Sequence, residues 1–387
     1  DGTIYNAYAT GSVTGTDVVG GLVGDNEGPI NNAYATGSIT GNDLVGGLVG
    51  DNGGPINNAY ATGSVTGNDF VGGLVGWHWH RIINNAYATG RVTGNDLVGG
   101  LVGFNTEIIN NAYATGRVTG TDSVGGLVGD NSGTINSAYA TGSVTGVNAV
   151  GGLVGRYWDG DWYYAQAITH SFWDIQTTGQ STSAGGVGLT TAQMKILANF
   201  NSATEANGNT NPGWDISANG GGNTVWRLYE GQSYPVLSSF QKNLTFTAND
   251  AGKTYDGVAY SGGNGVIQST ANDLSGTIRY GGSSQGATRP GRYAISPSVA
   301  MTQQDYQNWN VTFLDGVLTI DPVQPASGEI WLAGQARAPV PPSSTPPFAD
   351  RPAAEASAGS GTPFLNLAPE FIRLGVCPQD EECPPGR

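Results

Sequence analysis

Four aromatic residues form the first candidate binding surface in this sequence. Trp77 and Phe104 occupy equivalent positions in successive copies of a repeated unit, so their rings are predicted to stack. Tyr157 and Trp158 follow two copies farther along the same edge. Sugar rings stack on aromatic faces, and their hydroxyl groups need acceptors such as carboxylates. We therefore predict a glycan-binding edge here; the alternative is that these rings only cover irregular corners.

Metal binding has two candidate patterns. In the run WHWHR at 77–81, His78 and His80 are expected to share a strand face, but two imidazoles without a third ligand are weak support for a metal site. One aspartate recurs in each repeat and could bind calcium. The better explanation is that each aspartate is a turn residue whose side chain accepts hydrogen bonds from nearby backbone N–H groups. We predict no metal and no cofactor. The aspartate column comprises Asp17, Asp43, Asp69, Asp96 and Asp122.

Catalysis has little support. The sequence has three histidines, no nucleophile elbow and no zinc-binding helix motif. Asp159 and Asp161, beside Trp158 and Trp162, form the one carboxylate cluster that could serve acid and base roles. We predict that the protein is not an enzyme, with a polysaccharide-cleaving parallel β-helix enzyme as the alternative.

A tandem repeat must position these residues. The word NAYATG starts at 6, 32, 58, 85 and 111, SAYATG starts at 137, and VGGLVG follows each of them. Along NAYATGSVTG one parity carries Ala7, Ala9 and Val13, and the other carries Tyr8 and Thr10. The position of Ser12 becomes arginine in later copies, so the tyrosine parity faces solvent and the alanine parity faces inward.

This pattern predicts an all-β protein built on a parallel solenoid. One coil of two or three short strands cannot bury its own face, so about six coils of about 26 residues must stack. Parallel crossovers favour a right-handed coil. Glycine pairs and asparagine pairs are expected at corners, where positive backbone angles are needed.

Composition limits the partners. The formal net charge is −15 and there are only three lysines, which argues against nucleic acid. No run approaches the ~20 apolar residues of a membrane-spanning helix, so no transmembrane segment is expected. The sequence opens inside a repeat, as expected for a fragment or a processed product.

The chain changes character after the repeats. SFWD at 171–174 reads as a degenerate NAYA strand, and TTAQMKILANF at 190–200 is the one helix candidate, with Thr190 and Gln193 spaced as a capping box. Alternating strands follow, and then a stretch rich in Pro, Ala and Ser. The predicted parts are a solenoid at 1–155, its cap at 156–240, a small mostly-β domain at 241–321, a linker at 322–363 and a C-terminal tail at 364–387.

The repeated VGGLVG with its upstream AYATG resembles the GLUG motif of large exported bacterial proteins. KTYDG at 253–257 and PGRYAI at 290–295 are similar to motifs of the small YDG-type domains in the same proteins. The chain therefore resembles the C-terminal part of filamentous-haemagglutinin-like, two-partner-secretion adhesins. This resemblance implies a secreted rod on the surface of a Gram-negative bacterium, which attaches to a glycan or protein of a host or neighbouring cell. A ligand-free structural spacer is a further alternative.

Cys377 and Cys383 are the only cysteines, with five residues between them. An exported chain meets oxidising conditions, and a two-cysteine zinc site would lack its other ligands, so we predict a disulfide-closed acidic loop. Some two-partner adhesins end in such a pair. The resemblance implies that it holds the protein at its outer-membrane transporter, with the stretch from 322 as a tether.

Overall fold

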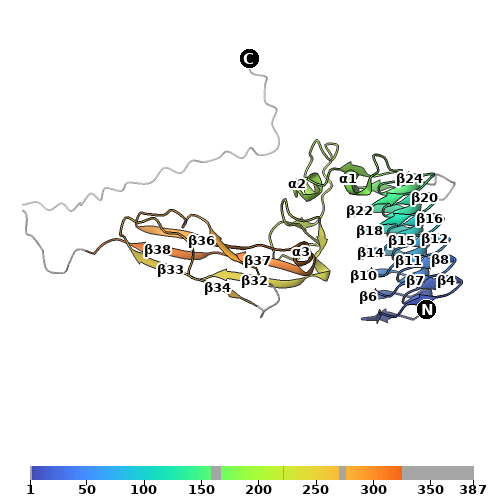
Figure 1. Cartoon of the computed structure of the whole chain (residues 1–387), viewed down its shortest axis with the longest axis horizontal. Helices are drawn as coiled ribbons and strands as arrows, with labels where there is room; N and C mark the ends of the chain where they lie inside the picture. Colours follow the sequence, from blue (N-terminus) through green and yellow to red (C-terminus); the bar gives the residue numbers. More distant parts are fainter. Residues whose placement is uncertain (1, 158–166, 221, 270–275, 325–387) are drawn as a thin grey trace, which may run out of the picture. The chain divides into compact units, whose positions relative to one another are not determined.

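The computed structural model describes residues 2–157, 167–220, 222–269 and 276–324, all within the compact unit Asp1–Pro325. Its N-terminal part is a stack of coils that carries four parallel sheets, which we name A to D (Figure 1). Sheets B, C and D have six strands each, which confirms the predicted solenoid of six coils. Each coil contributes strands to all four sheets, whereas the sequence predicted two or three strands per coil.

Sheet A carries the NAYA segments, and its strands pair in register from coil to coil, so that Ile30 pairs with Ile56 and Ile56 with Ile83. Its solenoid strands are β1 (Ile4–Tyr5), β2 (Tyr8–Ala9), β6 (Ile30–Ala35), β10 (Ile56–Ala61), β14 (Ile82–Ala88), β18 (Ile108–Ala114) and β22 (Thr134–Ala140). The short strands of sheet B are β3 (Val13–Thr14), β7 (Ile39–Thr40), β11 (Val65–Thr66), β15 (Val92–Thr93), β19 (Val118–Thr119) and β23 (Val144–Thr145).

Sheets C and D contain the VGGLVG segments. Sheet C is formed by β4 (Asp17–Gly20), β8 (Asp43–Gly46), β12 (Asp69–Gly72), β16 (Asp96–Gly99), β20 (Asp122–Gly125) and β24 (Val150–Gly151). Sheet D is formed by β5 (Val23–Asn26), β9 (Val49–Asn52), β13 (Val75–His78), β17 (Val102–Asn105), β21 (Val128–Asn131) and β25 (Val154–Tyr157).

The interior of the solenoid is divided into two cores. The larger core contains the alanines and isoleucines of sheet A and the leucine and second valine of each VGGLVG, as in Ala59 and Leu74. The smaller core joins sheets B and C through residues such as Val65 and Val71. The buried alanines confirm the predicted inward parity.

The glycine pairs are required because there is no room for a side chain, and not because their backbone φ angles are positive. A Cβ on Gly47 would lie 2.8 Å from the Ala61 Cβ and 2.1 Å from the Gly73 oxygen, so no side chain fits where the coil narrows. None of the glycines described in residues 2–157 has a positive φ. The prediction that glycine pairs supply positive angles is therefore wrong.

Positive φ occurs instead at two bulges per coil. One lies at the first asparagine of NAYATG, such as Asn32 (φ 53°), as expected for the asparagine corners. The other lies inside sheet C, at Val18, Leu44, Phe70, Leu97, Ser123 and Ala149. The flanking residues pair in register while the bulge residue is skipped, for example in Asp69↔Asp96 and Val71↔Val98.

The cap segment, residues 167–240, closes one end of the solenoid. It adds β26 (Ile168–Thr169), β27 (Phe172–Asp174) and β28 (Val187–Leu189) to sheet A. Phe172 pairs with Tyr139 and Trp173 with Ala140, which confirms SFWD as a degenerate NAYA strand. Trp173 packs into the larger core and thereby covers its end.

The cap segment also covers part of the outer face of sheet A. Trp226 contacts the rings of Tyr113 and Tyr139, and Phe240 meets Tyr60 and Tyr87 edge-on. Further elements of the cap segment are α1 (Ile175–Thr178), β29 (Ile216–Ser217), β30 (Trp226–Arg227), β31 (Val236–Leu237) and the 3₁₀ turn η2 (Ser238–Phe240).

The single helix predicted at 190–200 is wrong. The segment forms a 3₁₀ turn, η1 (Gln193–Lys195), and one helical turn, α2 (Ala198–Asn201). The predicted capping contacts are present, since the Thr190 N–H donates to Gln193 Oε1 over 2.8 Å. The Leu197 N–H, however, donates to the Glu230 carboxylate, which removes it from a helical hydrogen bond.

The segment 241–321, predicted as a small mostly-β domain, forms two sheets and one helix. One sheet has the order β34-β32-β37 and the other the order β33-β38-β36-β35. In KTYDG, Lys253 pairs with Asp256, and Asp256 accepts from the Val258 N–H over 2.9 Å, which closes a tight turn. Its elements are β32 (Lys242–Ala248), β33 (Ala251–Thr254), β34 (Val266–Gln268), β35 (Ile278–Gly281), β36 (Gly291–Val299), α3 (Gln303–Asn308), β37 (Trp309–Leu314) and β38 (Gly316–Asp321).

None of the helices in the described part of the chain has the length and apolar character needed to cross a bilayer.

Candidate functional site

Trp77 and Phe104 lie side by side on the outer face of sheet D. The in-register pairing of β13 and β17 places them in adjacent coils, with ring centroids 6.4 Å apart and planes inclined by 26°. The predicted stacking is therefore present. The equivalent positions in the other coils carry charged residues: Asp25, Asp51, Asp130 and Arg156.

Two further aromatic residues, missed at the sequence level, complete this surface. The Phe70 ring lies 6.3 Å from Trp77 and 6.1 Å from Phe104, and the Trp79 ring lies 6.4 Å from Trp77. We name Phe70, Trp77, Trp79 and Phe104 the aromatic corner. Phe70 occupies the bulge position of sheet C, where its positive φ of 54° turns the side chain out of the regular strand alternation.

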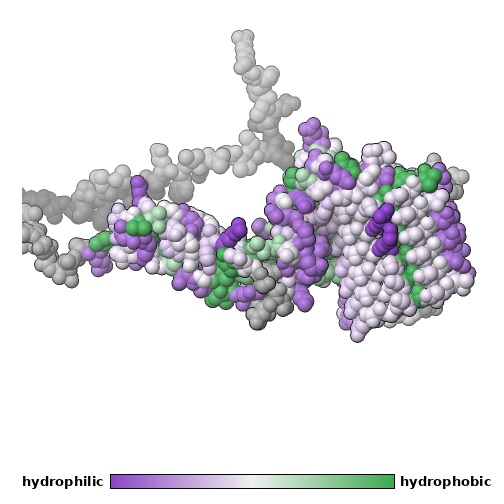
Figure 2. Space-filling model, viewed as in Figure 1, coloured by the Kyte–Doolittle hydropathy of each residue, from purple (hydrophilic) through white to green (hydrophobic). Residues whose placement is uncertain are grey.

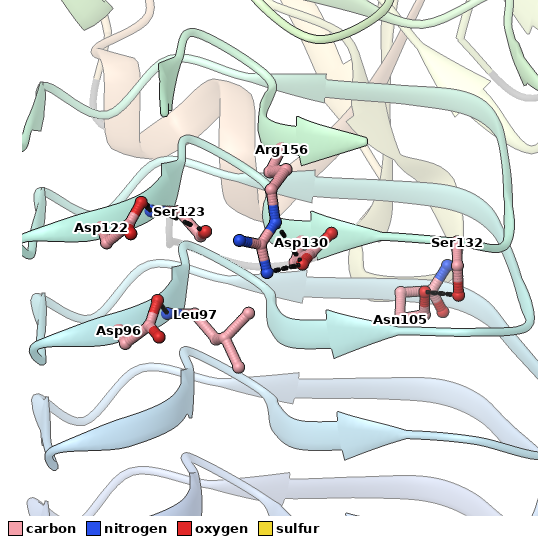
Figure 3. Close-up of polar contacts among 8 residues, drawn as sticks. All are labelled: Asp96, Leu97, Asn105, Asp122, Ser123, Asp130, Ser132 and Arg156. Carbon is pink, nitrogen blue, oxygen red and sulfur yellow. Dashed lines mark hydrogen bonds and ion pairs between the residues drawn. The ribbon is translucent and has the colours of Figure 1, made fainter. Parts of the chain in front are cut away.

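Carboxylates flank the aromatic corner along the stack. On one side, burial raises the pKa of Asp51, while a hydrogen bond with the Trp79 side chain opposes this shift. On the other side, Asp130 is only 1% exposed and accepts from Arg156 Nε over 2.8 Å (Figure 3). Burial raises the pKa of Asp130, and Arg156 lowers it in part. Asp51 is the flanking carboxylate with greater access to solvent.

The remaining predicted site residues do not join this surface. Tyr157 pairs with Asn131, so it belongs to the neighbouring, inward-facing column of sheet D rather than to the column of Trp77. Trp158, Asp159 and Asp161 lie outside the described residues, as does the cysteine pair Cys377 and Cys383.

The two histidines of WHWHR are separated by the fold. His78 is fully buried at a position that is asparagine in four other coils, and its Nδ1 lies 3.1 Å from Asn52 Nδ2. Burial lowers the pKa of His78 to about 4, so the ring is neutral at pH 7. His80 lies beyond the end of β13 and is exposed, so the prediction of a shared strand face is wrong. Within the described residues, no group of three His, Cys, Asp or Glu side chains is placed to hold a metal ion.

The aspartate column supports the sheet C bulges. Asp96 Oδ1 accepts from the Leu97 N–H over 2.8 Å, and Asp122 Oδ1 accepts from the Ser123 N–H over 2.7 Å (Figure 3). In both coils the donor belongs to the residue with positive φ. The prediction that these aspartates bind nearby backbone N–H groups is confirmed for Asp96 and Asp122.

The comparisons with known proteins concern the repeat. Residues 94–119 match the GLUG motif. The matched stretch contains Phe104 and belongs to the coil next to the one that carries Trp77, and the in-register stacking extends the same structure to the other coils. Neither the curated proteins nor the solved structures yield a match to this chain. The motif match and the stacked coils fit GLUG-repeat proteins. The YDG-type resemblance of 241–321 remains a prediction.

Proposed function

We propose that this chain is part of a secreted bacterial surface adhesin, in which the solenoid is a rigid rod that binds glycans at the aromatic corner. Secretion, the outer-membrane transporter and the anchoring role of Cys377 and Cys383 rest on the resemblance to filamentous-haemagglutinin-like exoproteins. The glycan site rests on the described residues.

The observation that carries this proposal is the departure of one corner from the repeat. Asp25, Asp51 and Asp130 occupy the same register position as Trp77, so the solenoid does not need an aromatic residue there. The bulge position of Phe70 likewise carries aliphatic or small side chains in the other coils. Folding alone therefore does not explain why four aromatic side chains gather at this corner.

The arrangement suits a sugar. The backbones of Trp77 and Phe104 are held by in-register strand pairing. Little conformational entropy is therefore lost when a sugar ring stacks on their side chains. Trp79 is 38% exposed, and Asp51 beside it offers acceptor atoms for hydroxyl groups. Aromatic faces with a few convergent polar groups are typical of small-molecule and sugar sites.

The test is a glycan array with the double variant Trp77→Ala/Phe104→Ala. We expect binding to be lost while the circular dichroism spectrum is retained, because neither ring belongs to the buried cores. Tyr8→Ala is the matched control, since Tyr8 is an aromatic residue of the same solenoid, 64% exposed on sheet A. Unaltered binding by the double variant would remove this corner from consideration.

The alternatives predict other results. A polysaccharide-cleaving enzyme would release new reducing ends or unsaturated products from a polysaccharide panel. A ligand-free spacer would leave the array blank with the wild-type protein.

A further inference from the structure

A groove opens directly beside the aromatic corner. It has a volume of about 760 Å³, and Pro55, Ile82 and Ile108 supply apolar surface. His80, Arg81 and Glu107 supply donors and acceptors in the same groove. Ile108 is 43% exposed, so the apolar part of the groove is open to solvent.

The groove and the aromatic corner form one continuous surface. The Trp79 ring lies 6.4 Å from Trp77 on one side and 5.9 Å from the His80 ring on the other, and it stacks on His80 with an interplanar angle of 27°. A ligand that leaves the face of Trp77 therefore meets Trp79 and then the groove. Its path crosses the turns between sheets D and A, and the groove itself is lined by residues of four successive coils.

The loop that builds this connection is peculiar to its coil. Ile56 pairs with Ile83, a separation of 83 − 56 = 27 residues, whereas Ile30 and Ile56 are separated by 56 − 30 = 26. The extra residue falls in the turn that holds Trp79 to Arg81. Arg81 absorbs it with a φ of 71°, a left-handed conformation that non-glycine residues rarely adopt. This turn departs from the repeat at the same corner as Trp77 and Phe70.

The charged side chains of the groove form no ion pair with one another in the described part of the chain. Two ion pairs occur among the described residues, Arg156–Asp130 and Lys253–Asp256, and neither belongs to the groove. Burial raises the pKa of Glu107, and the charges of His80 and Arg81 oppose that shift without a direct ion pair. Arg81 and Glu107 thus keep donor and acceptor capacity for a ligand.

We propose that the groove is an extension subsite of the aromatic corner, and that the ligand is a neutral oligosaccharide long enough to reach from Trp77 over Trp79 to Arg81 and Glu107. This inference rests on the proposed glycan-binding function. Neutrality follows from the surroundings. The groove contains Glu27 and Glu107 against Arg81 and a histidine, Asp51 lies next to it, and the whole chain carries −15. An anionic sugar meets net repulsion there.

Chain length provides the test. The full chain is titrated with dimers and hexamers of glucose, N-acetylglucosamine, mannose and galacturonic acid. For a neutral sugar that binds, we expect the hexamer to bind at least about tenfold more tightly than the dimer. Arg81→Ala/Glu107→Ala should reduce hexamer affinity to that of the dimer and leave dimer affinity unchanged. Arg117→Ala, at an exposed arginine on another face, should change neither.

The outcomes separate the two proposals. If Trp77→Ala/Phe104→Ala abolishes binding but the hexamer gains nothing over the dimer, the extension subsite is wrong and the aromatic corner stands. The same conclusion follows if Arg81→Ala/Glu107→Ala leaves the hexamer unaffected. A preference for galacturonic acid overturns the neutral ligand. Absence of binding by every sugar overturns the glycan-binding function itself.

Discussion

The solenoid carries two aromatic arrays, one regular and one irregular. The tyrosines of NAYATG form a ladder in which neighbouring rings lie 4.8–5.2 Å apart with planes within 9° of parallel. The rings of the aromatic corner lie 6.1–6.4 Å apart at angles of 26° to 66°. One residue per coil builds the ladder, whereas departures from the repeat build the corner.

The two arrays also differ in what covers them. Tyr113 and Tyr139 are 2% and 1% exposed under the cap segment, and Tyr8 at the other end of the ladder is 64% exposed. The ladder is thus partly a docking surface for the chain's own cap. Figure 2 shows that the visible solenoid surface is mostly of intermediate hydropathy, with a column of hydrophobic patches along the stack. The covered tyrosines bind the cap segment, whereas the irregular aromatic residues form the proposed ligand site.

The sharpest way to break this comparison is to remove one tryptophan that covers the tyrosine ladder and one that belongs to the aromatic corner. Trp226 is fully buried against Tyr113 and Tyr139, and its Nε1 donates to Asn111 Oδ1 over 3.2 Å. Trp226→Ala should lower the free energy of unfolding by about 3–5 kcal/mol, as large-to-small substitutions in cores do. Trp79→Ala, at an exposed ring, should lower it by less than about 1 kcal/mol. Urea denaturation measures both, and equal losses would contradict the distinction.

A second prediction concerns the histidine beneath the aromatic corner. The native pKa of His78, about 4, lies below its ordinary value of 6.5. Between these values the unfolded state binds more protons than the folded state, so this residue lowers stability as pH falls through that window. The loss from pH 7 to pH 4 is about 3 kcal/mol.

His78→Asn restores the residue found at this position in neighbouring coils and is the matched variant. It should remove this component of the pH dependence and leave stability at pH 7 little changed. Partly buried carboxylates with raised pKa values, such as Asp51 and Asp69, contribute with the opposite sign in both proteins. The difference between variant and wild type, followed by thermal melts from pH 7 to pH 4, isolates His78. A constant difference would refute the assignment.

A third, smaller effect tests the regular part of the solenoid. Ala35 is 1% exposed and packs against Gly21, so Ala35→Leu overpacks the core and should cost about 1–3 kcal/mol. Ser38→Arg should be nearly neutral, because Arg91 and Arg117 already occupy the equivalent exposed position in later coils. Melting curves of the two variants that coincide would show that the assignment of inner and outer faces is wrong.

The repeat made most of the solenoid predictable, because each coil meets copies of itself. Ala33 must pair with Ala59, and Ala59 with Ala86, so one parity assignment decides every coil. The same comparison of copies could have revealed Phe70, the one aromatic residue among the equivalents Val18, Leu44, Leu97, Ser123 and Ala149. The bulge that turns Phe70 toward Trp77 could not be predicted from the sequence. A positive φ is rare for branched and aromatic residues, so local propensity argues against it.

By itself the sequence determined the coil, its inner face, its capping strand and the stacking of Trp77 on Phe104, because these depend on residues one repeat apart. Only the tertiary structure decided where the cap segment packs and which irregular residues meet. The contact of Trp226 with Asn111 joins positions 115 residues apart, and Glu230 breaks a helix that the local pattern of 190–200 favours. Such contacts depend on the packing of unlike segments, for which no local period exists. The irregular turn after His78 likewise places Trp79 between Trp77 and the groove.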